Sequence, residues 1–178
     1  MSRALFTVVF PEMTTAHVSW INKTRRAPAP YIEAHFTLAF GVTDVAEALY
    51  LSHVEEVARR HSRFAFHYRS IIPGADHRDE TGYAFLVPEE GDGEFRALHC
   101  DLYRGPLTHA LDPGAPYTHH MTPGRYPTMA EAQIRCEELN QSPIYISGFA
   151  EQLSVVALEN DCVTEIACFA LSSDQKAH

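Results

Sequence analysis

YIEAHFTLAF, residues 31–40, is the segment around which the rest of this chain of 178 residues is organised. In an extended strand, successive side chains point to opposite faces. His35 and Thr37 would therefore share one face, while Phe36 and Phe40 would lie on the other face, in a hydrophobic core. The segment thus predicts an imidazole and a hydroxyl held side by side on a rigid strand.

A second segment repeats this pattern 85 residues later, at His120-Met121-Thr122-Pro123. The same alternation places His120 and Thr122 on one face, with Met121 behind them. Pro123 has no backbone N–H, so we expect it at the edge of a sheet or at the end of the strand. The neighbouring His119 would face the side opposite to His120.

The remaining segments predict an α+β protein with a weak internal duplication. Apolar runs with alternating character predict strands, and apolar residues spaced three and four apart predict helices. The expected strands are residues 4–10, 64–70, 81–87, 150–158 and 162–171. The expected helices are residues 44–61, 95–102 and 128–140, with Asp44 and Thr128 as caps. Residues 12–30 are expected to form a polar surface loop, and residues 73–76 a turn.

Length and composition limit the class of protein. With 46% hydrophobic residues, the chain can bury a full core, and residues 1–178 fit one domain. No stretch approaches the roughly 18 to 20 apolar residues of a membrane span, and the start of the chain lacks a basic, signal-like segment. We therefore expect a cytoplasmic monomer with no membrane partner.

Charge and cysteine content exclude further classes. The net charge is −9 and the chain has only two lysines, whereas long nucleic acids require a broad positive field. A duplex is therefore not expected as a partner. The four cysteines form no CxxC pair, which predicts buried thiols in place of a zinc site or a disulfide framework.

Two histidines and two threonines are the groups that hydrolysis of a cyclic phosphodiester needs. The reaction requires a base that deprotonates water, an acid that protonates the departing oxygen, and donors that hold the phosphoryl oxygens. Histidine suits both proton-transfer roles because its pKa of about 6.5 allows one ring to be neutral while the other is protonated. This scheme requires no metal and no cofactor.

The two segments resemble the paired HxTx motifs of the two-histidine (2H) phosphoesterase superfamily. This superfamily includes bacterial 2'-5' RNA ligase-like proteins and cyclic nucleotide phosphodiesterases. The resemblance rests on HFTLAF, residues 35–40, and PYTHHMTPGR, residues 116–125. The order of the elements matches from residue 4 to about residue 171.

The resemblance implies a bilobal fold with two pseudo-symmetric antiparallel-sheet lobes, helices outside and a central cleft. His35 and His120 would divide the base and acid duties, and Thr37 and Thr122 would bind the phosphoryl group. Which histidine is the base depends on whether the product oxygen is 2'- or 3'-linked. Arg125 is a candidate phosphate or base contact. The partner would be a small nucleotide or a short RNA end, and its identity would be read by residues 12–30 and 70–80.

Two other functions remain open from the sequence. A relative without catalytic activity could use the same cleft to bind a nucleotide or an RNA end. A metal hydrolase could be built from some of the eleven histidines, although HExxH is absent.

Overall fold

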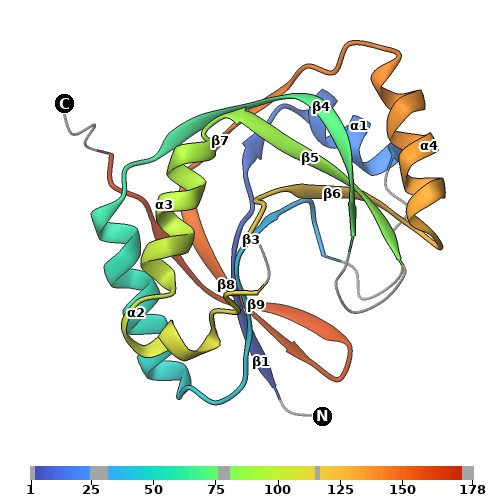
Figure 1. The fold of residues 1–178 in the computed structure, drawn as a ribbon. Coiled ribbons are helices and arrows are strands. Elements are labelled where there is room, and N and C mark those ends of the chain that lie inside the picture. Colours follow the sequence, from blue (N-terminus) through green and yellow to red (C-terminus); the bar gives the residue numbers. More distant parts are fainter. Residues whose placement is uncertain (1–2, 25–31, 76–80, 115–116, 174–178) are drawn as a thin grey trace.

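Two antiparallel sheets with helices on their outer sides make up the molecule, which confirms the predicted bilobal α+β fold (Figure 1). The computed structural model describes residues 3–24, 32–75, 81–114 and 117–173. Sheet A has the strand order β3-β1-β8-β9, and sheet B has the order β2-β7-β4-β5-β6. The strands are β1 (Ala4–Val9), β2 (Glu12–Met13), β3 (Phe36–Val42), β4 (Phe64–Ala75), β5 (Gly82–Glu90), β6 (Met121–Tyr126), β7 (Ile146–Ala150), β8 (Gln152–Glu159) and β9 (Cys162–Ala170). The helices are α1 (Thr15–Thr24), α2 (Glu47–Arg60), α3 (Asp92–Leu102), the 3-10 helix η1 (Gly105–Ala110) and α4 (Met129–Asn140).

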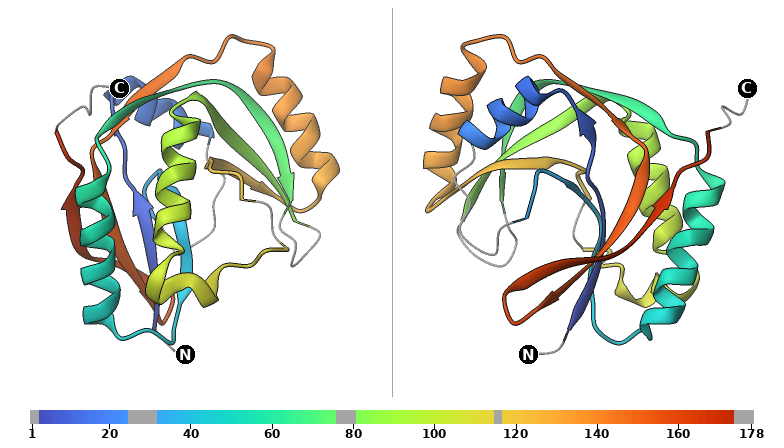
Figure 2. Two further views of the ribbon diagram at one scale, coloured as in Figure 1. Left: turned by 60° about the vertical axis from the view of Figure 1, so that its left-hand side comes forward. Right: turned by 180° about the vertical axis from the view of Figure 1, so that it is seen from behind.

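The longer helices bury their apolar stripes against the sheets. Helices α2 and α3 pack side by side on sheet A, and α4 packs on β4 and β5 of sheet B (Figure 2). The stripe predicted for α2 is buried at Tyr50, Val54 and Val57, but Leu49 is 53% exposed. Burial of these stripes is the main stabilising contribution of each helix.

An aromatic cluster joins the two sheets directly behind the first motif. Phe36, on β3 of sheet A, is fully buried and stacks on Phe95 of α3, with ring centroids 4.0 Å apart. Its ring also lies 5.3 Å from Phe66 and 5.8 Å from Tyr68, both on β4 of sheet B. The two lobes therefore share one core, and the strand that carries the first motif is anchored in it.

Residues 12–24 do not form the surface loop that was predicted for residues 12–30. They contain β2 and helix α1, at whose start the Thr14 hydroxyl accepts a hydrogen bond from the backbone N–H of His17 (3.3 Å). Ile21 is fully buried and Trp20 packs half-buried against the core. Few large apolar side chains mark the buried side of the helix, which is why the sequence pattern did not reveal it. Residues 25–30 of the predicted loop lie outside the described residues.

Of the two predicted helix caps, one is confirmed and one is wrong. The Thr128 hydroxyl accepts a hydrogen bond from the backbone N–H of Glu131 (3.2 Å), as expected for the start of α4. Asp44 does not cap α2, because that helix begins at Glu47 and the Asp44 carboxylate lies 3.0 Å from the Nε2 of His109.

Two further sequence predictions are corrected. The turn expected at residues 73–76 is absent from residues 73–75, which still pair with β5 as part of β4, and residue 76 lies outside the described residues. Buried thiols were expected, yet only Cys136 is buried; Cys100, Cys162 and Cys168 are exposed, and all four cysteines are free.

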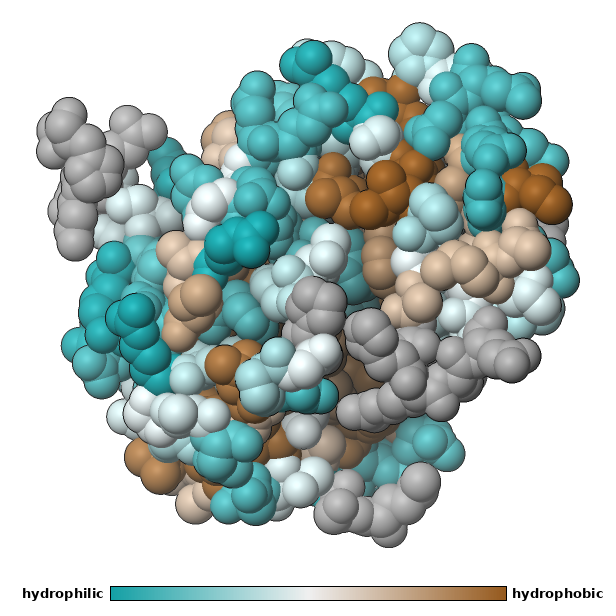
Figure 3. Space-filling view, in the orientation of Figure 1, coloured by the Kyte–Doolittle hydropathy of each residue, from teal (hydrophilic) through white to brown (hydrophobic). Residues whose placement is uncertain are grey.

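The visible surface of sheet B between helices α3 and α4 is more hydrophobic than the outer surfaces of these helices. Hydrophilic side chains cover much of the visible face, and hydrophobic ones reach the surface between α3 and α4, over sheet B (Figure 3). Within the described residues, none of the helices has the length and hydropathy of a membrane span.

Candidate active site

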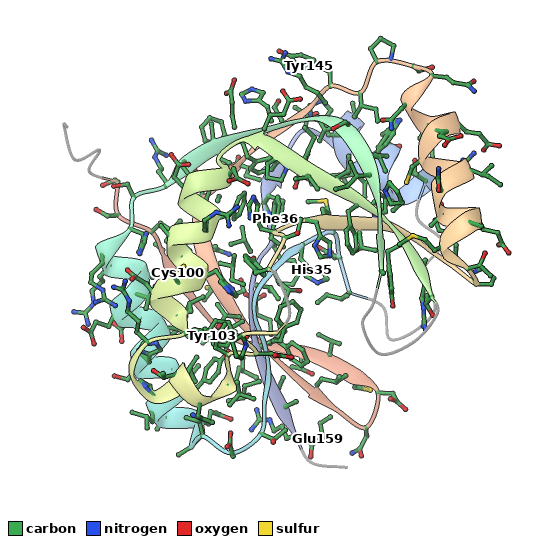
Figure 4. The ribbon with its side chains drawn as sticks, in the orientation of Figure 1. His35, Phe36, Cys100, Tyr103, Tyr145 and Glu159 are labelled. Atoms are coloured by element: carbon green, nitrogen blue, oxygen red, sulfur yellow. The ribbon has the colours of Figure 1, made fainter. Side chains whose placement is uncertain are left out.

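The two motif histidines occupy equivalent positions in the two sheets. His35 immediately precedes β3, one of the two outer strands of sheet A, and His120 immediately precedes β6, one of the two outer strands of sheet B. Figure 4 shows His35 in the middle of the molecule, between the two sheets and close to Phe36. The sequence placed both histidines inside strands; the structure places each of them at the point where the strand begins.

Both imidazoles make the same hydrogen bond. The Nδ1 of His35 lies 2.7 Å from the backbone oxygen of Glu33, and the Nδ1 of His120 lies 2.5 Å from the backbone oxygen of Thr118. A carbonyl oxygen only accepts, so in each ring Nδ1 carries the proton and donates it. In the neutral ring Nε2 is then the acceptor, and the same tautomer is fixed twice.

A phenylalanine supports each histidine ring. The ring of Phe85, on β5, stacks on His120 with centroids 3.6 Å apart and an interplanar angle of 25°. Phe85 in turn lies over Gly74 of β4, where a Cβ atom would come within 1.9 Å of the phenyl ring. The contact at His35 is looser, an edge-on approach by Phe10 with centroids 6.0 Å apart. Phe85 therefore supports the His120 ring, and the glycine at position 74 leaves the space that the Phe85 ring occupies.

The environment of His120 favours its neutral form. Burial is the main cause that lowers its pKa from the usual 6.5 to about 4. The Thr118 carbonyl opposes this shift, and the positive charges that His35 and His119 carry when protonated add to it. His35 is thus near enough to His120 for its charge to affect the pKa of the His120 ring.

The motif threonines sit beside irregularities in both strands. Thr37 pairs with Val8, and the pairing between β1 and β3 shifts by one residue at Leu38. At this bulge, Leu38 and Ala39 are both buried. The bulge reverses the alternation of side chains beyond them. Phe40 is therefore 50% exposed and not in the core, where it had been predicted. Thr37 itself is half-buried.

Pro123 is accommodated by the second bulge. The pairing between β5 and β6 shifts between Met121 and Gly124, and β6 is the outer strand of sheet B. Edge strands and bulges are the places where a missing backbone donor is tolerated. The strand continues to Tyr126, so Pro123 does not end it, and Thr122 stays half-buried next to it.

Tyr117 connects the second motif to the first, and the sequence analysis gave it no role. Its hydroxyl donates a hydrogen bond to the backbone oxygen of Thr37 (2.8 Å). Its ring stacks on His99 of α3, with centroids 3.6 Å apart and an interplanar angle of 3°. Burial lowers the pKa of His99, and its Nδ1 lies 2.8 Å from the backbone oxygen of Leu38. The two motifs are thus tied together through the outer edge of β3.

His119 lies away from His120, as the alternation predicted. It is 1% exposed, and its Nε2 lies 2.6 Å from the Oδ1 of Asp92 at the start of α3. Burial lowers the pKa of His119, and the Asp92 carboxylate opposes this shift. Its ring stacks on Phe95 of the central aromatic cluster, with centroids 5.5 Å apart. His119 therefore anchors the second motif in the core.

A family model described as the 2'-5' RNA ligase superfamily matches residues 10–161 of the chain. The chain belongs to the 2'-5' RNA ligase superfamily. This assignment confirms the resemblance that the two HxTx motifs carry. A comparison with curated proteins gave no match.

Solved structures support the fold of this superfamily member across nearly its whole length. The structure of Escherichia coli LigT complexed with NADP+ has a TM-score of 0.59 at 15% identity and covers 98% of this chain and 100% of LigT. TT0787 of Thermus thermophilus has a TM-score of 0.59 at 19% identity and covers 94% and 97% of the two chains. Kluyveromyces marxianus Usb1 has a TM-score of 0.56 at 8% identity and covers 96% and 99%.

In this superfamily member, Arg125 lies on β6 beyond the second motif. Its side chain is exposed. The Cζ of Arg125 lies 5.9 Å from the ring centre of Tyr83, which is its cross-strand partner on β5. The Nη2 of Arg125 donates a hydrogen bond to the Thr81 hydroxyl (3.3 Å).

A pocket of about 910 Å³ lies elsewhere on the molecule, and its lining residues include Glu12, Phe64 and Phe149. None of the five predicted site residues lines this pocket.

Proposed function

We propose that this superfamily member is a metal-independent phosphoesterase that hydrolyses a cyclic phosphodiester of a nucleotide or an RNA end. The observation that carries the proposal is the matched pair of imidazoles, each fixed in one tautomer by a backbone carbonyl and each at the start of an outer strand. A symmetric pair of this kind supplies one base and one acid on opposite sides of a phosphorus atom.

His120 is the base in the proposed reaction, because burial keeps its ring neutral at pH 7. Its Nε2 takes a proton from water while the water oxygen forms a bond to phosphorus. The ring P–O bond breaks, and His35 gives a proton to the departing oxygen. A bound phosphate anion stabilises the imidazolium that forms, so the pKa of His120 rises toward neutrality in the complex.

Thr37 and Thr122 are proposed to donate hydrogen bonds to the phosphoryl oxygens, and Arg125 to bind a neighbouring part of the substrate. Thr37 lies on β3, directly after His35, and Thr122 and Arg125 lie on β6, directly after His120. Structural neighbours complexed with 3'-AMP, in Escherichia coli LigT, and with uridine monophosphate, in Kluyveromyces marxianus Usb1, support a small nucleotide as the ligand class.

Hydrolysis of 2',3'-cyclic mononucleotides by the purified protein is the first test. We expect one linear monophosphate isomer as product, identified by phosphorus NMR, and an unchanged rate after treatment with EDTA. Binding of the cyclic nucleotides in calorimetry without any turnover would favour a binding protein instead. A stoichiometric metal in elemental analysis, together with loss of activity in EDTA, would favour a metal hydrolase. Within the described residues there is no group of three or more histidine, cysteine or acidic side chains placed to hold a metal ion.

The pH dependence of kcat/KM tests the assignment of His120 as the base. Its pKa of about 4 in the folded protein lies below the usual value of about 6.5, so the ring gains its proton only in acid. We expect kcat/KM to stay level on the acid side down to about pH 5 and to fall about tenfold per pH unit below about pH 4.

Protein stability is expected to change with pH in the same sense. The unfolded chain binds a proton on this histidine below about pH 6.5, so the free energy of unfolding should fall between about pH 6.5 and 4. Circular dichroism at each pH separates inactivation from unfolding. An acid limb near pH 6.5, in protein that is still folded, would contradict a buried neutral base at position 120.

A further inference from the structure

Two consecutive residues at the start of the second motif contact both motifs. The hydroxyl of Tyr117 donates a hydrogen bond to the backbone oxygen of Thr37, at 2.8 Å. The backbone oxygen of the next residue, Thr118, accepts the hydrogen bond of the His120 imidazole, at 2.5 Å. Consecutive Cα atoms are only about 3.8 Å apart along a chain. The threonine of the first motif and the proposed base of the second are therefore held by neighbouring residues.

The ring of Tyr117 is held in one orientation by its aromatic neighbours. It stacks on His99 with centroids 3.6 Å apart and an interplanar angle of 3°. The ring of Phe40 approaches it edge-on at 6.4 Å, and the ring of His119 lies 5.9 Å away. Burial raises the pKa of Tyr117, so its hydroxyl keeps the proton that it donates. These ring contacts would remain if the hydroxyl alone were removed.

The bond from Tyr117 supports β3 at a weak place. β3 is one of the two outer strands of sheet A, so it has a neighbouring strand, β1, on one side only. The pairing with β1 shifts immediately after Thr37, at the bulge of Leu38, and a bulge interrupts the ladder of backbone hydrogen bonds. The Tyr117 hydroxyl therefore adds a bond next to the point where the ladder is interrupted.

We propose that Tyr117 is a positioning residue, whose bond to Thr37 fixes the first motif relative to His120 without contacting the substrate. The proposal rests on the proposed function for the reaction itself. In that reaction Thr37 binds the phosphoryl group while His120 activates the water, so the rate depends on the distance between these two residues. A displacement of about 1 Å can lower a rate about 100-fold. Loss of this one hydroxyl should therefore reduce catalysis more than it reduces stability.

Tyr103 provides a matched control, because its hydroxyl also bonds to the backbone of β3. The N–H of Phe40 donates to this hydroxyl at 2.9 Å, and burial raises the pKa of Tyr103 as well. Tyr103 directly follows α3 and belongs to neither motif, and Figure 4 shows it away from His35. Tyr103→Phe therefore removes a hydroxyl bond from the same strand but leaves the link between the two motifs intact.

Steady-state hydrolysis of a 2',3'-cyclic mononucleotide by the two variants tests the proposal. Tyr117→Phe keeps the ring and removes only the hydroxyl, and we expect it to lower kcat/KM about 10- to 100-fold. Tyr103→Phe should keep the kcat/KM of the unaltered protein. Each variant loses one hydrogen bond, so both melting temperatures should fall by a similar amount, about 2–4 °C. Circular dichroism measures the melting temperatures.

NMR of the imidazole rings provides a second measurement, which does not need turnover. Two-dimensional proton–carbon spectra report on the surroundings of each ring, and the signals of His35 and His120 are assigned by their loss in the alanine variants. We expect Tyr117→Phe to shift the signals of both motif histidines. Tyr103→Phe should leave these signals in place. A purely stabilising role of Tyr117 would not distinguish the two variants in this way.

The outcomes separate this proposal from the proposed function. An unchanged kcat/KM in Tyr117→Phe, or an equal fall in Tyr103→Phe, would overturn the positioning role while hydrolysis itself stands. Failure of Tyr117→Phe to fold, when Tyr103→Phe folds, would also overturn it, because the bond would then be needed for folding. If the unaltered protein hydrolyses no cyclic nucleotide, the proposed function fails and NMR decides. Shifted histidine signals in Tyr117→Phe alone would then support the link between the motifs, and the same signals in both variants would overturn it.

Discussion

Replacement of either motif histidine by alanine should lower kcat/KM for a cyclic nucleotide by roughly 10²- to 10⁴-fold, which is the usual contribution of one positioned acid or base. His35→Ala removes the proposed acid and His120→Ala the proposed base. The two losses should not multiply in the double variant, because the base and the acid act in one step. Initial rates for the single and double variants measure this directly.

His17 provides the control for the histidine variants. It is a half-buried histidine whose Nδ1 also lies near a backbone oxygen, that of Ser147 at 3.1 Å, and it precedes a hydroxyl residue in the sequence His17-Val18-Ser19. His17→Ala should therefore retain full activity. Thermal melting of all variants should show that the proteins are folded. Retained activity in both His35→Ala and His120→Ala would refute the proposed chemistry.

Phe36→Ala should lower the free energy of unfolding by about 3–5 kcal/mol, as is usual when a large aromatic side chain is removed from a core. The ring is fully buried, and it contacts Phe95 of α3 as well as Phe66 and Tyr68 of the other sheet. The cavity would therefore open at the junction of the two lobes. This loss is a large part of the roughly 5–15 kcal/mol that stabilises an ordinary domain. Urea denaturation measures it.

Phe40 is the matched control on the same strand. It is 50% exposed because the bulge at Leu38 reverses the alternation, so Phe40→Ala should change the free energy of unfolding by only about 0.5 kcal/mol. An unbroken alternation would instead give the two variants similar losses. A larger loss in Phe40→Ala than in Phe36→Ala would contradict the arrangement of the core.

The sequence was sufficient for the two HxTx segments, which depend on local alternation and on spacing along the chain. The family and the bilobal fold followed from the resemblance of these segments to the motifs of the 2H phosphoesterase superfamily. The sequence was not sufficient for the bulges at Leu38 and Pro123, which arise from pairing with β1 and β5. An alternation rule assumes a regular strand, and one extra residue inverts every side chain beyond it. The exposure of Phe40 is the direct result.

Contacts between segments that are distant in the sequence also could not be predicted from local sequence patterns. Tyr117 reaches Thr37 across 80 positions of the chain, and Phe85 meets His120 only after sheet B has formed. One signal was present in the sequence: the alternation of the segment TGYAFLV, residues 81–87, puts Tyr83 and Phe85 on one face. Which face this is depends on the pairing of β5 with β6, and that pairing is a property of the tertiary structure.

The rings of Tyr117, His99 and Tyr103 have a consequence for self-association. Exposed outer strands present unpaired backbone groups that recruit strands from other molecules, and this is a common route to aggregation. Along β3 the oxygens of Thr37 and Leu38 are bonded to Tyr117 and His99, and the N–H of Phe40 donates to the Tyr103 hydroxyl (2.9 Å). These three bonds occupy backbone groups on the outer edge of β3, so they oppose intermolecular β-pairing along the strand that follows His35.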